Sequence, residues 1–235
     1  MNKILNYGLS TIIAITMSGN LFSQTNQEYK QRVKELTELN EKNDSNITNH
    51  LELGNIYSKL DKTSKAINEY NKVLELDSTN IEALYGRAKT YVYEENLDKM
   101  NAAEKDLTKV IASKKYSGKE LAQIYLIRAE ARDNQSEIPQ DAYSAKRSYD
   151  LIVASQLDSL NPEIQYELGF YYDDNEYYDA SLESFIKAAD LEERLAKKEN
   201  REVNPKYEKE FNRTKNNYEL FGRVKDSERF KIVVR

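Results

Sequence analysis

Apolar residues recur along most of this chain at the spacing of an amphipathic helix, and the predicted helices come in pairs. Within residues 47–80, Leu53, Gly54 and Tyr57 share one helical face, and a polar turn follows at 61–62. A second apolar stripe comes after the turn and comprises Ala66, Tyr70, Val73 and Leu74. Steps of three and four residues predict an α-helix on each side of the turn.

The same order of residues returns more than a hundred positions later. Leu168, Gly169 and Tyr172 are followed by Tyr178, Ser181, Phe185 and Ala188. Sixteen residues separate Gly54 from Tyr70, and sixteen separate Gly169 from Phe185. We interpret the small residues as the points where two helices cross closely, and the large apolar ones as filling the space around the crossing.

This order resembles the tetratricopeptide repeat, a helix–turn–helix unit of about 34 residues. The repeats are expected over residues 47–191, approximately as 47–80, 81–117, 118–161 and 162–195. The resemblance implies an all-α fold in which about four repeats stack into a right-handed α-α superhelix, a solenoid. Residues 24–46 are expected to form an N-terminal capping helix, and residues 192–235 the C-terminal capping helices and tail.

The two middle repeats are more degenerate. The second has Leu84, Ala88 and Tyr91 in its first helix, while its second stripe comes three residues late, so we assign the extra residues to a turn at 94–100. That second stripe comprises Ala103, Leu107, Val110 and Ile111. The third repeat has Tyr125, Arg128, Ala129 and Arg132 in its first helix, and its second helix is predicted to bury Ala145, Tyr149, Ile152 and Val153.

Three helix ends can also be predicted. Asn161 is expected to cap a helix that begins at Pro162, because an Asn side chain satisfies free N–H groups and proline fits the first turn. Val33, Leu36 and Leu39 lie at helical spacing and should cover the first repeat. Asn204-Pro205 should end one helix and begin an amphipathic closing helix, whose apolar residues are Tyr207, Phe211, Tyr218 and Phe221.

The N-terminal stretch, residues 1–23, differs in kind from the rest. Lys3 is its one charged residue, and after an apolar run from Ile4 to Met17 small residues lie near Leu21-Phe22-Ser23. This pattern is typical of a secretory signal peptide, with the mature chain beginning near Gln24. The alternatives are an uncleaved membrane anchor and an ordinary first helix. Export predicts a periplasmic or secreted protein, and we expect a bacterial envelope.

Composition narrows the class of protein. The chain has 235 residues, of which 39% are hydrophobic and 32% charged, with only 7 Gly and 3 Pro, as expected for a soluble helical protein. A net charge of −5 argues against nucleic-acid binding, which favours basic surfaces. The absence of Cys excludes disulfides, a lipid-anchored N-terminal cysteine and Cys-based metal sites.

No catalytic, cofactor or metal site is expected. His50 is the single histidine and falls on an inward helix position, which favours packing. The acidic run Asp173–Glu176 with Asp179 lacks the glycine and distal glutamate of a calcium loop, so we interpret it as a turn with Asn175 in a left-handed conformation. The pairs Glu94-Glu95 and Glu192-Glu193 are interpreted as solvated helix faces rather than paired catalytic carboxylates.

The resemblance implies a ligand site in the concave groove that the first helices of the repeats line. Asn55 and Lys89 are expected to bind backbone carbonyls or a carboxylate, and Tyr85, Tyr166 and Phe170 to bury apolar side chains. The full candidate set is Leu51, Asn55, Tyr85, Lys89, Tyr93, Tyr166 and Phe170. Leu51, Gln123 and Ile127 stand where the family's carboxylate clamp has polar or basic residues, which argues against binding of a peptide's C-terminal carboxylate.

The predicted function is that of an exported, non-enzymatic scaffold that binds a protein or peptide in the concave groove. The alternative is a structural subunit of a cell-envelope assembly, which would bind through its convex face or its end helices. A third hypothesis is an accessory domain of a cell-wall enzyme system. Repeat folds serve many functions, so the partner stays unidentified at this stage.

Overall fold

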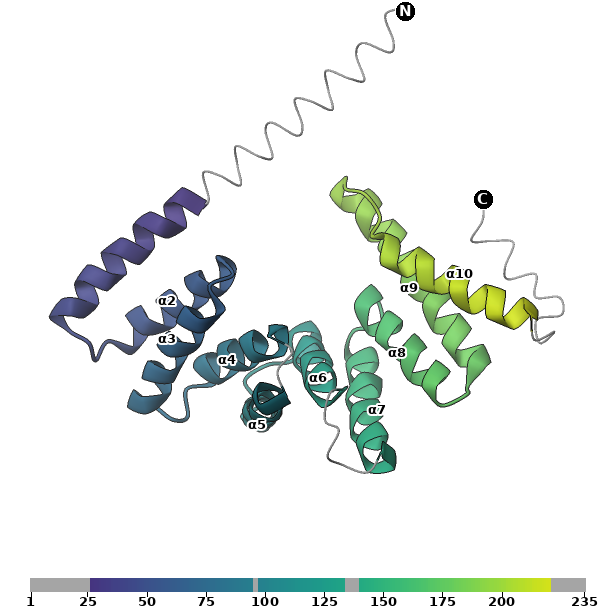
Figure 1. Cartoon of the computed structure of the whole chain (residues 1–235), viewed down its shortest axis with the longest axis horizontal. Helices are drawn as coiled ribbons and strands as arrows, with labels where there is room; N and C mark the ends of the chain where they lie inside the picture. Colours follow the sequence, from purple (N-terminus) through teal and green to yellow (C-terminus); the bar gives the residue numbers. More distant parts are fainter. Residues whose placement is uncertain (1–25, 95–96, 134–139, 221–235) are drawn as a thin grey trace, which may run out of the picture. The chain divides into compact units, whose positions relative to one another are not determined.

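The structure is a computed structural model that describes residues 26–94, 97–133 and 140–220, and the regular elements within these ranges are α-helices (Figure 1). The predicted signal peptide at residues 1–23 lies outside the described residues. The chain forms two compact units, Met1–Asn96 and Leu97–Arg235, which are described separately below as unit 1 and unit 2.

Unit 1 contains a helix at residues 26–42, followed by α2 (Ile47–Lys59), α3 (Thr63–Leu76) and α4 (Ile81–Tyr93). Helix α3 packs against α2 on one side and α4 on the other (Figure 1). The buried cluster between these helices comprises Leu36, Leu53, Ile56, Tyr57, Ala66, Tyr70, Val73 and Ala83. Both apolar stripes predicted for the first repeat therefore contribute to one core.

Asparagine caps define where several first helices begin. Asn46 precedes α2, and its side chain accepts a hydrogen bond from the N–H of Asn49. Asn80 caps α4 in the same way through the N–H of Ala83. In unit 2, Asn161 accepts from the N–H groups of Glu163 and Ile164, and Pro162 occupies the first turn, which confirms the predicted cap.

Tyr70 forms the centre of unit 1. Its ring is 2% exposed and lies against the backbone of Gly54 on α2 and Gly86 on α4. A Cβ atom built on Gly54 would lie 2.7 Å from the ring, and one built on Gly86 would lie 2.5 Å from it. The close crossing predicted at Gly54 is confirmed, and Gly86 serves the same ring from the other side. Burial raises the pKa of the Tyr70 hydroxyl to about 12.

The N-terminal helix buries a polar residue that the sequence pattern did not predict. Leu36 is fully buried, but Leu39, which was predicted to cover the first repeat, is 48% exposed. Its neighbour Asn40 is buried instead and hydrogen-bonds to Asn49 and to His50. The prediction for Leu39 is wrong because these polar partners on α2 require a polar residue on the helix above them.

His50 has the structural position that was predicted for it. Its ring is fully buried, and its Nδ1 lies 2.6 Å from Oε2 of Glu69 on α3. Its Nε2 lies 2.9 Å from the backbone carbonyl of Asp44, so the ring joins the entry of α2 to α3. Because both ring nitrogens are used inside unit 1, the side chain serves packing.

Unit 2 contains α5 (Leu97–Ala112), α6 (Gly118–Asp133), α7 (Gln140–Leu157), α8 (Pro162–Asp174), α9 (Tyr178–Glu199) and α10 (Pro205–Leu220). Each helix packs against the next along the chain (Figure 1). Helix α5 begins inside the turn that was predicted at 94–100, and Met100 is 2% exposed within it. That part of the prediction is wrong, because the extra residues lengthen a helix. The stripe Ala103, Leu107 and Val110 is buried as predicted.

Helix α7 turns a different face inward from the predicted one. Tyr149 is 59% exposed, Ile152 is 40% exposed and Ala145 is also exposed, whereas Val153 is half-buried. The buried face instead comprises Arg147, Ser148, Asp150, Leu151 and Ala154. The α7 prediction is wrong because arginines on α6 require an acidic partner, which outweighs the burial of two large apolar side chains.

The last repeat follows the predicted pattern again. A Cβ atom built on Gly169 would lie 2.6 Å from the ring of Phe185, so α8 and α9 cross as closely as α2 and α3. The turn between them differs in one detail. The residue with positive φ is Glu176, at 62°, whereas Asn175 has a φ of −101°. Asn175 donates from its side chain to the carbonyl of Tyr171 instead, so its assignment as the left-handed residue is corrected.

Candidate functional site

In unit 1 the predicted groove residues lie on α2 and α4. Asn55 is exposed, and its Oδ1 accepts a hydrogen bond of 2.9 Å from the Tyr70 hydroxyl. This bond orients the amide through its oxygen and leaves its N–H₂ group to act as a donor. Asn55 is therefore both a packing residue and a positioned hydrogen-bond donor.

Helix α4 contributes Tyr85, Lys89 and Tyr93, which follow one another at four-residue steps and so share a face. Tyr85 is half-buried, Lys89 is exposed and Tyr93 is 74% exposed. A half-buried aromatic beside an exposed amine and an exposed aromatic can hold an apolar side chain and hydrogen-bond to backbone carbonyls. Leu51, the seventh candidate in the set, is half-buried against the core of unit 1.

In unit 2 the two predicted aromatics belong to a ring cluster on α8. Tyr166 and Phe170 are both half-buried, with ring centroids 4.9 Å apart in an edge-on arrangement. Both also meet the ring of Phe185, and Tyr166 meets Tyr207 of α10 at 5.2 Å. The ammonium group of Lys206 lies 4.6 Å from the Tyr166 ring centroid. Tyr166 and Phe170 therefore pack against the core of the last repeat and remain partly accessible to solvent.

Carboxylates lie near the Tyr166 ring, since the charges of Glu210, Glu167 and Glu163 act on its hydroxyl. Glu163 accepts from Lys206 at 2.6 Å and from the Tyr207 hydroxyl at 2.8 Å. Glu167 accepts from Arg147 at 2.9 Å. Glu130 of α6 lies close enough to both carboxylates to feel their charge. We call Glu130, Glu163, Tyr166, Glu167 and Phe170 the acidic–aromatic face.

Glu130 is the electrostatically unusual member of this face. Burial raises the pKa of its carboxyl to about 7, and the charges of Glu167 and Glu163 add to the effect. Lys206 and Arg147 oppose the shift but do not cancel it. Burial likewise raises the pKa of Tyr166 to about 12. The face thus holds a half-buried acid whose ionised form would be stabilised by an added positive charge.

Sequence reasoning missed Glu130, although a signal for it was present. Matching Tyr125, Arg128 and Ala129 to Leu84, Arg87 and Ala88 places Glu130 at the position of Lys89 in the next helix pair. That position was already assigned to the groove. An acidic residue does not match the basic and polar clamp of the family, so its position alone did not single out Glu130.

A buried ionic cluster in unit 2 is structural. Asp150 of α7 is fully buried and accepts two hydrogen bonds from Arg128, at 2.6 and 2.8 Å, and a third from Arg132 at 2.8 Å. Arg132 also donates to Glu104 of α5 at 2.9 Å. The cluster joins α5, α6 and α7, and its charged groups are satisfied by one another, which is what a structural role requires.

A second paired carboxylate corrects an interpretation from the sequence. Glu192 was interpreted as part of a solvated face, but it is only 2% exposed. It accepts two hydrogen bonds from Arg201, at 2.6 and 3.0 Å, and another from the backbone N–H of Asn204. The bonds from Arg201 lower the pKa of Glu192. This side chain therefore fixes the connection between α9 and α10.

Within the described ranges, no group of three or more histidine, cysteine or acidic side chains is arranged to hold a metal ion. In the same part of the chain, no helix combines the length and the apolar character that crossing a bilayer requires.

Comparison with known proteins agrees with this architecture. Residues 54–92 match the family model of the TPR (tetratricopeptide) repeat, which confirms the resemblance found in the sequence. No curated protein matches the chain. The structure is similar to that of MamA, with a TM-score of 0.61 at 20% identity over 74% of this chain and 94% of MamA.

Two further solved structures share the fold. PilW, described as a widely conserved type IV pilus biogenesis factor, gives a TM-score of 0.56 at 15% identity over 100% of both chains. YrrB, described as a TPR protein with an unusual peptide-binding site, gives 0.52 at 18% identity over 66% of this chain and 74% of YrrB. At these identities the likeness establishes the all-α solenoid fold of tetratricopeptide repeats, as predicted.

Proposed function

We propose that this chain is an exported, non-catalytic scaffold that binds a protein or peptide on the side formed by the first helices of its repeats, the concave side of the expected superhelix. The observation that carries the proposal is the acidic–aromatic face of unit 2. Glu163 pairs with Lys206 and Glu167 with Arg147, whereas Glu130 makes no ion pair within the described part of the chain. A lysine or arginine from a partner would pair with Glu130 there.

The neighbouring rings give such a partner a second anchor. Tyr166 and Phe170 are half-buried, and Glu163 and Glu167 act electrostatically on both Tyr166 and Glu130, so an apolar side chain next to a basic one in an extended peptide would meet both kinds of surface. The peptide-binding site named for YrrB supports this use of the fold. We therefore propose a basic, apolar-flanked segment as the ligand of unit 2.

Unit 1 offers a different set of contacts. Asn55 and Lys89 would bind backbone carbonyls or a carboxylate, while Tyr85 and Tyr93 would cover an apolar side chain. The orientation of Asn55 by the Tyr70 hydroxyl supports this assignment, because a positioned donor loses little freedom on binding. Leu51 contributes apolar surface at most.

A displayed peptide library screened against the full chain would test the proposal. We expect selected peptides to combine Lys or Arg with a neighbouring apolar residue. Phe170→Ala and Glu130→Gln should each weaken the best peptide by about 1–3 kcal/mol. Lys187→Glu, an exposed change on the second helix of the same repeat, is the matched control and should leave affinity unchanged. Binding that is indifferent to both face variants, or lost equally in the control, would refute the proposal.

Export is the second component of the proposal. The signal-like residues 1–23 motivate it, and the pilus-biogenesis role named for PilW supports an envelope protein. Mass spectrometry of the native protein should show an N-terminus near Gln24 in a periplasmic or secreted fraction. An intact Met1 in the cytoplasmic fraction would exclude export.

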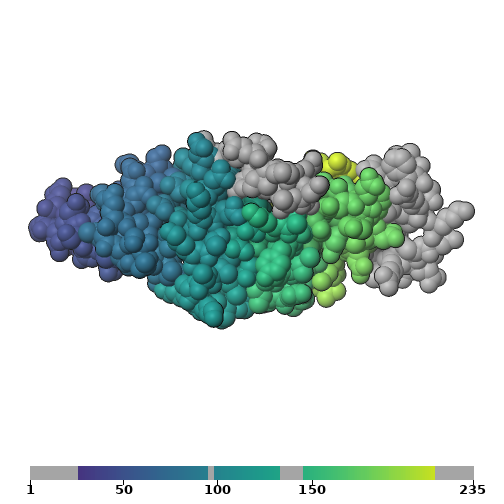
Figure 2. All heavy atoms as spheres, turned by 90° about the horizontal axis from the view of Figure 1, so that it is seen from below, coloured from purple at the N-terminus to yellow at the C-terminus, as the bar shows by residue number. Residues whose placement is uncertain are grey.

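One observation favours the alternative function, that of a structural subunit of a cell-envelope assembly. Tyr149 and Ile152 of α7 are large apolar side chains that are 59% and 40% exposed, and part of the helix, coloured green, is visible at the surface in Figure 2. If the chain is held in an assembly by this side, Tyr149→Asp should release it from native complexes while Phe170→Ala should not. The reverse ordering would favour the groove.

A further inference from the structure

Helix α10 leaves exposed, beside a pocket, two of the three positions that the first helices of other repeats bury, while the third, Phe211, is buried against Leu182 and Phe185. Counted from the first residue of each helix, the fourth, seventh and eighth positions are His50, Leu53 and Gly54 in α2. In α8 they are Gln165, Leu168 and Gly169. All six are buried, and the contacts of His50, Gly54 and Gly169 run to the second helix of their own repeat.

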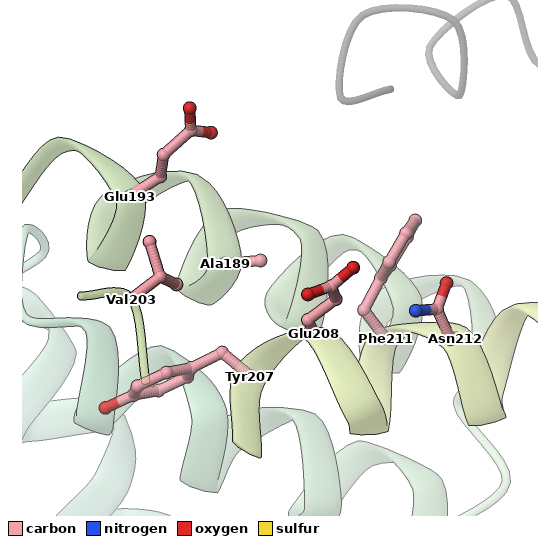
Figure 3. Close-up of a pocket in the computed structure, with 7 residues that line it drawn as sticks. All are labelled: Ala189, Glu193, Val203, Tyr207, Glu208, Phe211 and Asn212. Carbon is pink, nitrogen blue, oxygen red and sulfur yellow. The ribbon is translucent and has the colours of Figure 1, made fainter. Parts of the chain in front are cut away.

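In α10 the same three positions are Glu208, Phe211 and Asn212. They line a pocket of about 350 Å³ together with Ala189 and Glu193 of α9 and Val203 of the connection. Figure 3 shows these side chains around the pocket together with Tyr207, which also lines it and whose hydroxyl donates to Glu163. Helix α10 is thus the first helix of a repeat, and its pocket lies where a second helix would pack.

The segment that follows α10 has the residues such a second helix needs. In the first repeat the ring that meets Gly54 belongs to Tyr70, and Val73 and Leu74 follow it. In the fourth repeat the corresponding residues are Phe185, Ala188 and Ala189. After Asn212, an aromatic with two apolar residues three and four positions later occurs at Phe230, Val233 and Val234.

The spacing fits the length of α10. The ring lies sixteen residues after the eighth position in the first and fourth repeats, and Phe230 lies eighteen residues after Asn212. Helix α10 has 16 residues where α2 and α8 have 13, so the longer helix accounts for the later aromatic.

The charges of pocket and segment are complementary. Glu193 and Glu208 are exposed at the rim of the pocket. Residues 221–235 contain five basic residues against two acidic ones, Asp226 and Glu228. The basic residues are Arg223, Lys225, Arg229, Lys231 and Arg235. An apolar anchor flanked by positive charge therefore matches an apolar pocket flanked by negative charge.

We infer that residues 221–235 occupy the α9–α10 pocket and complete a fifth repeat, with Phe230 packed beside Asn212, at the position where Tyr70 meets Gly54 in the first repeat, and basic neighbours paired with Glu193 and Glu208. The segment is joined directly to α10, so its effective concentration at the pocket is in the mM range expected of short tethers, which favours it over a second copy or another protein. The last repeat is then closed by the chain itself.

Tryptophan fluorescence in the full chain tests this directly, because the sequence contains no Trp. Phe230→Trp should give blue-shifted emission and several-fold weaker acrylamide quenching than Tyr93→Trp, whose site is 74% exposed. Adding Glu208→Lys to Phe230→Trp should raise the quenching while circular dichroism stays unchanged. Quenching of Phe230→Trp equal to that of the exposed control would overturn the inference.

A cross-link identifies the occupant. The chain has no Cys, so Asn212→Cys with Ser227→Cys creates a single thiol pair and keeps the Phe230 ring, because Ser227 lies three residues before it. A short bis-maleimide should join the pair within one chain, independently of protein concentration. Lys209→Cys with Ser227→Cys is the control, because Lys209 is exposed on α10 outside the pocket lining, and it should react far less. Equal reaction in both variants, or cross-linked dimers in place of monomers, would overturn the inference.

Discussion

The first and third repeats solve the same packing problem with opposite chemistry. In the first, α2 and α3 meet around one aromatic ring, since Tyr70 packs on the bare backbone of Gly54. In the third, α6 and α7 meet around ions, since Arg128 and Arg132 share the buried carboxylate of Asp150. The polypeptide order is the same, but one crossing is held by ring packing and the other by charge-assisted hydrogen bonds.

This difference shows what an ionic crossing does to the rest of a helix. Once Asp150 faces α6, Tyr149 lies about 100° around the helix and Ile152 beyond it, so the large apolar residues of α7 face outward. The first repeat buries its stripe and leaves charge outside. A buried ion pair adds little net stability but fixes the rotation of the helix, because misaligned charges would be unpaired.

The largest effect is expected from removing the centre of the ionic crossing. Asp150→Ala would leave the guanidinium groups of Arg128 and Arg132 without their shared buried partner, which should cost about 3–5 kcal/mol in the free energy of unfolding. Denaturant titration followed by circular dichroism measures this loss.

The matched control removes an acid from an exposed pair. Asp190 accepts from Arg194 one turn along α9, and the Arg194 side chain is 74% exposed. Asp190→Ala should cost about 0–1 kcal/mol. Similar losses in the two variants would contradict the view that the third repeat depends on its buried ions.

Overpacking tests the ring crossing. Gly54→Leu and Gly169→Leu each place a side chain where a Cβ atom alone would lie 2.7 or 2.6 Å from an aromatic ring, so α2 and α8 must move away from α3 and α9. We expect each to cost up to about 3 kcal/mol, visible as a lower melting temperature. Unchanged melting in both variants would show that the crossings are looser than the distances indicate.

The fold was predictable wherever the apolar pattern is unambiguous. The stripes around Gly54 and Gly169 and the cap at Asn161 lie where the sequence placed them. The misplaced positions, Leu39 and Tyr149, each stand next to a buried polar residue, Asn40 or Asp150. The spacing of apolar residues within one helix carries no information about the neighbouring helix, where an arginine or histidine can require a polar partner.

The candidate site was predictable only in part. Register alone selects Tyr85, Lys89 and Phe170, but it does not reveal that Asn55 is already bonded to Tyr70. Nor could it show that Lys206, which belongs to α10, returns to the ring of Tyr166 on α8. Contacts between distant segments depend on how the helices pack, and the acidic–aromatic face of unit 2 depends on them.

The second and third repeats can also be compared at equivalent surface positions, Lys89 in the second and Glu130 in the third. The pKa of Glu130 is raised from 4.5 to about 7, so the protonated carboxyl is favoured in the native state. Its favourable contribution is therefore complete below pH 4.5 and is lost as the pH rises through 7. Glu130→Gln should leave the free energy of unfolding nearly unchanged near pH 4.5 and raise it by up to about 3 kcal/mol at pH 8.

Denaturant titrations at several pH values would show this crossover. Glu183→Gln on α9, an exposed position, is the control and should show no such pH dependence. A uniform effect of Glu130→Gln at every pH would mean that ionisation of the Glu130 carboxyl does not destabilise the native state. The electrostatic argument for a basic ligand would then lose its basis.

The smallest effect tests the comparison most directly, because sequence alone treats Tyr149 as the counterpart of Tyr70. Tyr70 is 2% exposed and lies between two glycines, so Tyr70→Ala should cost about 3–5 kcal/mol through the cavity that it leaves. Tyr149 is 59% exposed, so Tyr149→Ala should change the free energy of unfolding by less than about 0.5 kcal/mol. Parallel denaturation of the isolated, monomeric variants measures both. A loss in Tyr149→Ala that approaches the loss in Tyr70→Ala would mean that α7 buries its apolar stripe after all. The ionic crossing would then not set its rotation.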